Sequence, residues 1–170
     1  HKYSNWATAA LYRRYLVNHD GTFLTSLLDA FVADYETWMR EKGTQSGLLW
    51  QHDIRDGMEE SISGGRRVQN IRPPLNCYLY ANAVAISKVA RMAGHDDLAR
   101  EYAEKAARLK SLIHELLWDA EAEFFKVWRP DGTLADVREE IGFIPWCFDL
   151  PEAGYERAWR QLLDPQGFKE

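Results

Sequence analysis

Apolar residues recur three or four positions apart along much of the chain, which is the spacing of one face of an α-helix. The first such stretch runs from Asn5 to Val17. The second runs from Thr22 to Gly43, after a turn at residues 18–21 that resembles a helix end. Its apolar positions are Leu24, Leu27, Leu28, Phe31, Tyr35, Trp38 and Met39. The pattern predicts two helices, the second of which buries one face.

Two longer helices are predicted in the middle of the chain, from Leu75 to Ala93 and from Asp96 onward. Gly94 ends the first of them, and the second has apolar positions that continue to Leu117. The turn between the two helices is very short. We therefore expect them to pack as an antiparallel hairpin.

The period changes after Trp118-Asp119. Residues 124–128 have the pattern of a short strand, residues 129–132 that of a turn, and residues 133–137 that of a returning strand. Two short helices are predicted at 141–148 and 152–163. The expected fold class is therefore all-α, built from helical hairpins with one small β-hairpin.

The segment from Gly43 to Pro74 interrupts the helical pattern for about thirty residues. It contains five glycines and a Pro-Pro pair. It also contains apolar residues such as Leu49, Trp50 and Ile54, which argue against disorder. Connections of this length in a compact domain usually carry function, so we interpret residues 43–74 as an ordered functional loop.

Composition excludes several classes of function. The net charge is −5 and no basic stripe is visible, so a nucleic-acid partner is not expected. No apolar run is long enough for a membrane span. The two cysteines, Cys77 and Cys147, lack a zinc-ligand spacing, so we expect two buried free thiols and no metal or other cofactor. Aromatic residues make up 13% of the chain, and aromatic rings often line sugar-binding clefts.

The loop carries four carboxylates within eight residues, at Asp53, Asp56, Glu59 and Glu60. Crowded carboxylates in a partly apolar site raise at least one pKa. A carboxylic acid that stays protonated near neutral pH can protonate a glycosidic oxygen. Nearby arginines would keep the other carboxylates ionised to hold sugar hydroxyls. The alternatives are a solvated acidic loop and a divalent-cation site, although the spacing does not match a calcium loop.

Four segments, in order along the chain, resemble the trehalase-related glycoside hydrolases of family 63, which include mannosylglycerate-hydrolase-like members. Residues 56–61 (Asp-Gly-Met-Glu-Glu-Ser) are similar to the motif that contains the family's acid. Residues 72–80 resemble its Pro-x-x-Leu-Asn-x-x-Leu-Tyr stretch, and residues 116–125 resemble its Leu-Trp-Asp segment. Residues 140–146 resemble the segment that follows. The match runs from about Trp38 to the end.

The resemblance implies an (α/α)6 barrel, known as a six-hairpin glycosidase fold, and inverting hydrolysis of a glycosidic bond. Glu59 aligns with the family's general acid, an Asp, and Asp56 would bind a sugar hydroxyl or tune the acid. Glu60 stands where trehalases have an aromatic residue, which argues against trehalose as the substrate. The expected substrate-binding residues are Trp50, Asp53, Arg55, Arg66, Arg72, Asn76, Tyr80 and Trp146.

The family's catalytic base lies far downstream of Trp146, and the chain supplies about half the helices of a closed barrel. We therefore expect residues 1–170 to be a central part of a barrel, inactive in isolation, that self-associates through uncovered helix faces. A periplasmic or secreted location is favoured over a cytoplasmic one. The competing hypothesis is a non-catalytic, helical-repeat-like scaffold that binds a carbohydrate or protein partner.

Overall fold

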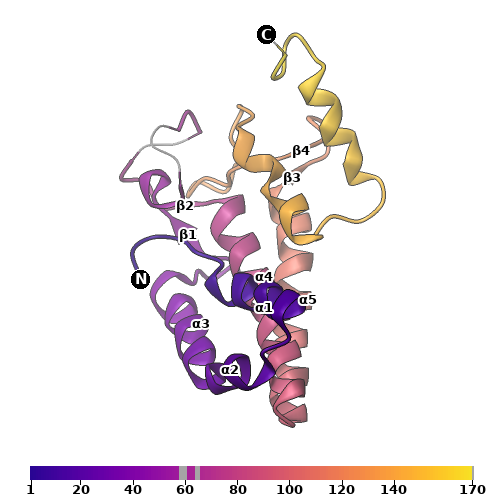
Figure 1. The fold of residues 1–170 in the computed structure, drawn as a ribbon. Helices are drawn as coiled ribbons and strands as arrows, with labels where there is room; N and C mark the ends of the chain where they lie inside the picture. Colours follow the sequence, from indigo (N-terminus) through magenta and orange to yellow (C-terminus); the bar gives the residue numbers. More distant parts are fainter. Residues whose placement is uncertain (58–60, 64–65, 170) are drawn as a thin grey trace.

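The computed structural model describes residues 1–57, 61–63 and 66–169. The described chain is mostly helical, with two very short antiparallel β-ladders (Figure 1). Its α-helices are α1 (Ala7–Asn18), α2 (Gly21–Ser26), α3 (Leu28–Lys42), α4 (Pro73–Met92) and α5 (Asp96–Leu117). This agrees with the predicted fold class.

Helix α4 is the centre of the molecule. It packs against α1, α3 and α5, and its residues are buried on nearly every side. A helix that is apolar all round is suited to this position, whereas α5 carries a narrow apolar stripe and an exposed polar face. The two helices form the predicted antiparallel hairpin, with Gly94 at φ 79° in the turn between them.

The predicted second helix is divided into α2 and α3 at Leu27. There the backbone N–H of Leu27 donates to the carbonyl oxygens of the preceding turn, and α3 starts anew at Leu28. The hydroxyl of Thr25 donates to Gly21 O, and that of Ser26 to Phe23 O. Hydroxyls that bond back to their own helix often bend it, which accounts for a break that the apolar spacing does not reveal.

The loop that precedes α4 is ordered in its described parts. Strand β1 (Trp50–Gln51) pairs antiparallel with β2 (Asn70–Ile71), and a 3₁₀ turn η1 (Asp53–Arg55) follows β1. Helix α4 then begins at Pro73, two residues earlier than predicted. Proline is well suited to a first helical turn, because its missing N–H would have no partner there. The loop therefore lies beside the start of α4.

The C-terminal β element differs from the prediction. The regular hairpin joins β3 (Trp118–Asp119) to β4 (Phe124–Phe125), whereas residues 128 and 134 form only an isolated bridge. The short helices that follow are 3₁₀ in type, at η2 (Glu140–Phe148) and η3 (Tyr155–Leu162). Pro145 lacks the N–H that a continuous α-helical ladder would need at its position in η2.

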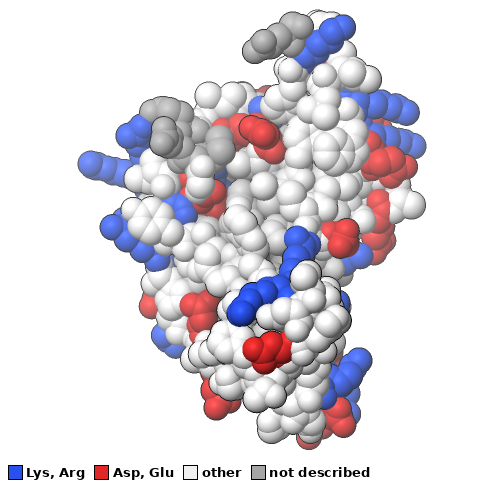
Figure 2. All heavy atoms as spheres, in the orientation of Figure 1, with Lys and Arg blue, Asp and Glu red and all other residues white. Residues whose placement is uncertain are grey.

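The described surface carries charges of both signs. On the face drawn in Figure 2, positive and negative side chains are interspersed around a largely uncharged central area. None of the helices in the described ranges is both long and apolar enough to cross a membrane. Both cysteines are free, but Cys147 is exposed, which corrects the expectation of two buried thiols.

Candidate active site

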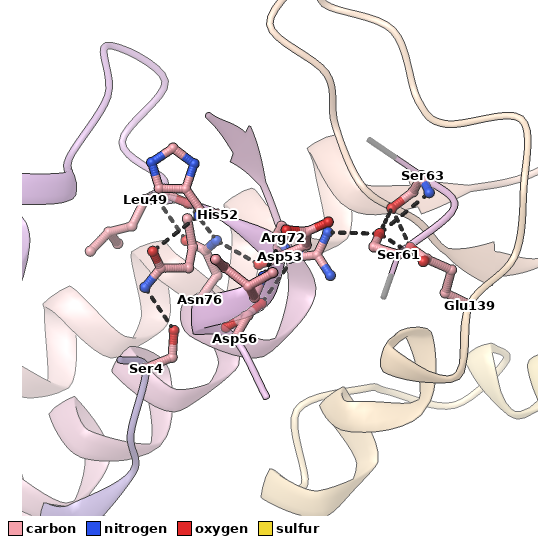
Figure 3. A network of polar contacts seen from close by, with 12 residues as sticks. Ser4, Leu49, His52, Asp53, Asp56, Ser61, Ser63, Arg72, Asn76 and Glu139 are labelled. Carbon is pink, nitrogen blue, oxygen red and sulfur yellow. Dashed lines mark hydrogen bonds and ion pairs between the residues drawn. The ribbon is translucent and has the colours of Figure 1, made fainter. Parts of the chain in front are cut away.

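A buried ion pair lies where the loop meets α4. The Nε atom of Arg72 donates to Oδ2 of Asp56 at 3.2 Å, and neither side chain has any solvent exposure. Nη1 of Arg72 also reaches Oγ of Ser61 at 3.4 Å (Figure 3). Arg72 immediately precedes α4, and its guanidinium is held by burial and by these two hydrogen bonds. Arg72 therefore binds Asp56 at one end of the acidic segment 56–61 and Ser61 at the other.

Burial controls the ionisation of Asp56. It raises the pKa of this carboxyl from 3.8 to about 6, and the opposing effect of the Arg72 guanidinium is smaller. One nitrogen of the guanidinium, Nη2, is buried and has no hydrogen-bond partner among the described residues. A buried donor of this kind costs free energy unless something satisfies it.

Glu139 holds the other side of the loop, and sequence reasoning did not select it. Its Oε1 accepts hydrogen bonds from Oγ of Ser61 and from the backbone N–H of Ile62, both at 2.8 Å, and its Oε2 accepts one from Ser63 (Figure 3). Its position directly before the motif at 140–146 was the one available signal. We call Asp56, Ser61, Ser63, Arg72 and Glu139 the Asp56 cluster.

Asn76 has a different place from the one predicted. Its side chain is fully buried, and its amide bonds only to main chain: Oδ1 accepts from Leu49 N, and Nδ2 donates to Leu49 O and Arg72 O. Asn76 therefore clamps the loop to the first turn of α4 and does not point to an open sugar site. Asp53 is also buried, and its Oδ1 accepts from the N–H of Ile54.

The predicted aromatic contacts do not gather at the Asp56 cluster. Trp50 lies on the other face of the β1–β2 ribbon, because successive strand residues alternate in direction and its neighbour Gln51 is the one that is buried. Tyr80 lines a groove between α1 and α4, and Trp146 lines an apolar hollow of η2 and η3. No member of the Asp56 cluster lines either one.

Three further predicted residues belong to the loop. Arg55 is half-buried, and its carbonyl oxygen accepts from the backbone N–H of Ser4. Arg66 is exposed. Glu59, the predicted acid, lies outside the described residues. The sugar contacts of both arginines and the acid role of Glu59 remain predictions. Within the described residues, no three His, Cys, Asp or Glu side chains are grouped as metal ligands.

The whole chain, residues 1–170, matches the Mannosylglycerate hydrolase MGH1-like glycoside hydrolase domain. The chain belongs to this family. This MGH1-like domain is therefore related to enzymes that hydrolyse glycosidic bonds, in agreement with the resemblance carried by the four sequence motifs.

Two relatives show how much of a longer protein the MGH1-like domain represents. A solved structure named sialidase matches 99% of the chain with 41% identity and a TM-score of 0.94, but only 16% of that structure is covered. A protein of Borreliella burgdorferi, named only as uncharacterized, is 24% identical over 118 residues, which are 69% of this chain and 24% of that protein. The chain thus spans less than a quarter of either relative.

Proposed function

We propose that this MGH1-like domain is the acid-bearing part of a larger glycoside hydrolase, with an (α/α)6 barrel and an inverting mechanism, and that Glu59 is the proton donor. The observation that carries the proposal is the double anchor of the acidic segment. Asp56 lies three residues before Glu59 and Ser61 lies two residues after it, and both bind Arg72 at the start of α4. A segment held at both sides is suited to presenting a catalytic side chain.

Asp56 is better suited to positioning than to proton donation. Its side chain is completely enclosed and bound to Arg72, so a sugar oxygen has no access to it in this arrangement. Of the two roles predicted for Asp56, this favours tuning the acid over binding a sugar hydroxyl. Glu139 positions the other side of the loop, because its carboxylate accepts hydrogen bonds from Ser61, Ile62 and Ser63.

An inverting hydrolase needs two carboxylates. In this proposal the chain supplies one of them, Glu59. Glu59 gives its proton to the leaving glycosidic oxygen while a second carboxylate activates a water on the opposite face of the sugar. The two groups are expected to lie about 6.5–9.5 Å apart. We place the second carboxylate in the rest of the protein, because the relatives extend far beyond the matched region.

Substitution of Glu59 tests this role. In the full-length protein, Glu59→Gln should lower kcat on an aryl glycoside by about 10²–10⁴-fold, because a general acid typically contributes that much. The substrate panel should include mannosylglycerate and an aryl sialoside, since the names of the family and of the solved relative point to these compounds. Proton NMR of the first product formed should show the inverted anomer. Unchanged turnover of every cleaved substrate would remove Glu59 from the role.

Glu139→Gln provides a matched comparison, because it keeps the size of the side chain while removing its charge and one of the two acceptor oxygens that bind Ser61, Ile62 and Ser63. A positioning role predicts a lower kcat with little change in KM, and a shifted alkaline limb of the pH profile, because that limb reports deprotonation of the acid. If the full-length protein binds sugars but cleaves no glycoside, the alternative of a non-catalytic scaffold is favoured.

A further inference from the structure

A groove of about 390 Å³ lies on the outer face of the β1–β2 ribbon, and Trp50 is the one predicted substrate-binding residue among those that line it. Its lining includes Trp50, Ile71 and Trp128. We call it the Trp groove. Its remaining walls come from Thr44, Gln45, Ser46, Gln69, Arg129, Pro130 and Gly132. The volume is in the range of sites that bind small molecules.

Strand pairing places the two tryptophans in one row. Trp50 is the direct antiparallel partner of Ile71, and Ile71 is in turn bridged to Trp128. Two backbone hydrogen bonds of 2.9 Å, one in each direction, join Ile71 to Trp128. Residues directly opposite one another in antiparallel strands project to the same face. Both tryptophan side chains therefore project to the same face, one on each side of Ile71.

The Trp groove and the Asp56 cluster lie on opposite faces of the ribbon. Gln69 and Ile71 line the groove, whereas the alternating residues Asn70 and Arg72 are buried on the inner side. Successive strand side chains point in opposite directions. The ribbon therefore separates the groove from the Asp56 cluster, and a ligand in the groove does not rest on the hydrolytic function.

The groove is lined mostly by aromatic, apolar and uncharged polar residues. Arg129, its one charged wall residue among those described, is paired with Asp136 at 2.7 Å. The Lys42 ammonium lies 3.6 Å from the ring centroid of Trp50, a contact that holds this ring in place. The exposed amides of Gln45 and Gln69 form no hydrogen bond within the described part of the chain. They are available to a ligand that carries hydroxyl groups.

We propose that the Trp groove is a binding site for an uncharged oligosaccharide, distinct from the hydrolytic site. The C–H faces of sugar rings pack against the electron-rich faces of Trp50 and Trp128, and the amides of Gln45 and Gln69 bind sugar hydroxyls. The site binds the glycan on the face of the ribbon opposite the Asp56 cluster.

Calorimetric titration of the full-length Glu59→Gln protein tests this site without turnover. The probes are the neutral hexasaccharides of the manno, malto, cello and xylo series, with hexagalacturonate as the anionic probe. We expect one neutral series to bind, and Trp128→Ala to raise its Kd by about tenfold through loss of ring stacking. Phe23→Ala is the matched control, since Phe23 is an aromatic residue that is 42% exposed on α2 and does not line the groove, and it should leave the Kd unchanged.

A second variant keeps the test valid if Trp128→Ala does not fold. Gln45→Ala with Gln69→Ala changes only exposed side chains, and it should raise the Kd several-fold while the thermal midpoint stays the same. The proposal is overturned if none of the neutral probes binds, if the variants bind as tightly as their parent, or if only hexagalacturonate binds. Failure of the hydrolytic proposal would appear separately, as equal turnover by the parent protein, which keeps Glu59, and by Glu59→Gln.

Discussion

At the scale of single residues, the site depends on buried polar groups that hold one another. Arg72 is fully enclosed and is shared between Asp56 and Ser61. Asn76 satisfies the backbone of Leu49 from within the core. Groups of this kind are costly when one partner is removed, because the other is left buried without a hydrogen bond. The loop is therefore held by a few side chains rather than by regular secondary structure.

The raised pKa of Asp56 predicts a pH-dependent stability. The folded-state pKa is about 6 and the ordinary value is 3.8, so the contribution of this group is fully present below about pH 4 and is lost as the pH rises through 6. The free energy of unfolding should fall over this window by on the order of 3 kcal/mol relative to Asp56→Asn. Urea denaturation of both proteins between pH 4 and 7 measures the difference. A constant difference across the window would contradict the assignment.

At the scale of elements, local sequence signals set where most helices begin and end, but close packing sets how they meet. Gly142 in η2 illustrates this, because a Cβ atom there would overlap the ring of Phe124 and the carbonyl oxygen of Phe125. The backbone of η2 can approach β4 only with glycine at this position. The segment that carries Glu139 is thereby fixed next to the loop.

Gly142→Ala should destabilise the protein by about 1–3 kcal/mol, the usual cost of overpacking a core. Gly21→Ala is a suitable control, since its added methyl group would lie at ordinary contact distance, 3.6 Å, from Met92 and Tyr15. Denaturant unfolding should show a lower midpoint for Gly142→Ala than for Gly21→Ala. Equal midpoints for Gly142→Ala and the parent would show that η2 can move away from β4.

At the scale of the whole molecule, the helices leave apolar surface uncovered. The hollow of η2 and η3 is lined by Phe143, Trp146, Trp159, Leu162 and Phe168, and its volume is about 750 Å³. Trp159 and Leu162 are 41% and 45% exposed. Large apolar hollows on soluble proteins usually mark interaction surfaces. This agrees with the proposal that the MGH1-like domain is covered by further helices of a larger barrel.

The isolated 170-residue polypeptide is therefore expected to self-associate. Sedimentation velocity should show a weight-average mass that rises with concentration, and Trp159→Lys with Leu162→Lys should reduce it by interrupting the apolar hollow. A monomer at high concentration would argue against an uncovered barrel face.

The sequence alone predicted α1, the α4–α5 hairpin and the location of the acidic loop, but not the break between α2 and α3. These features follow from local signals, such as the three- and four-residue spacing of apolar positions and Gly94 after α4. Tertiary structure decided which predicted residues meet. Strand alternation turns Trp50 away from Arg72, and Glu139 reaches Ser61 across 78 positions of sequence. Such contacts depend on how elements pack, and no local pattern in a single sequence encodes them.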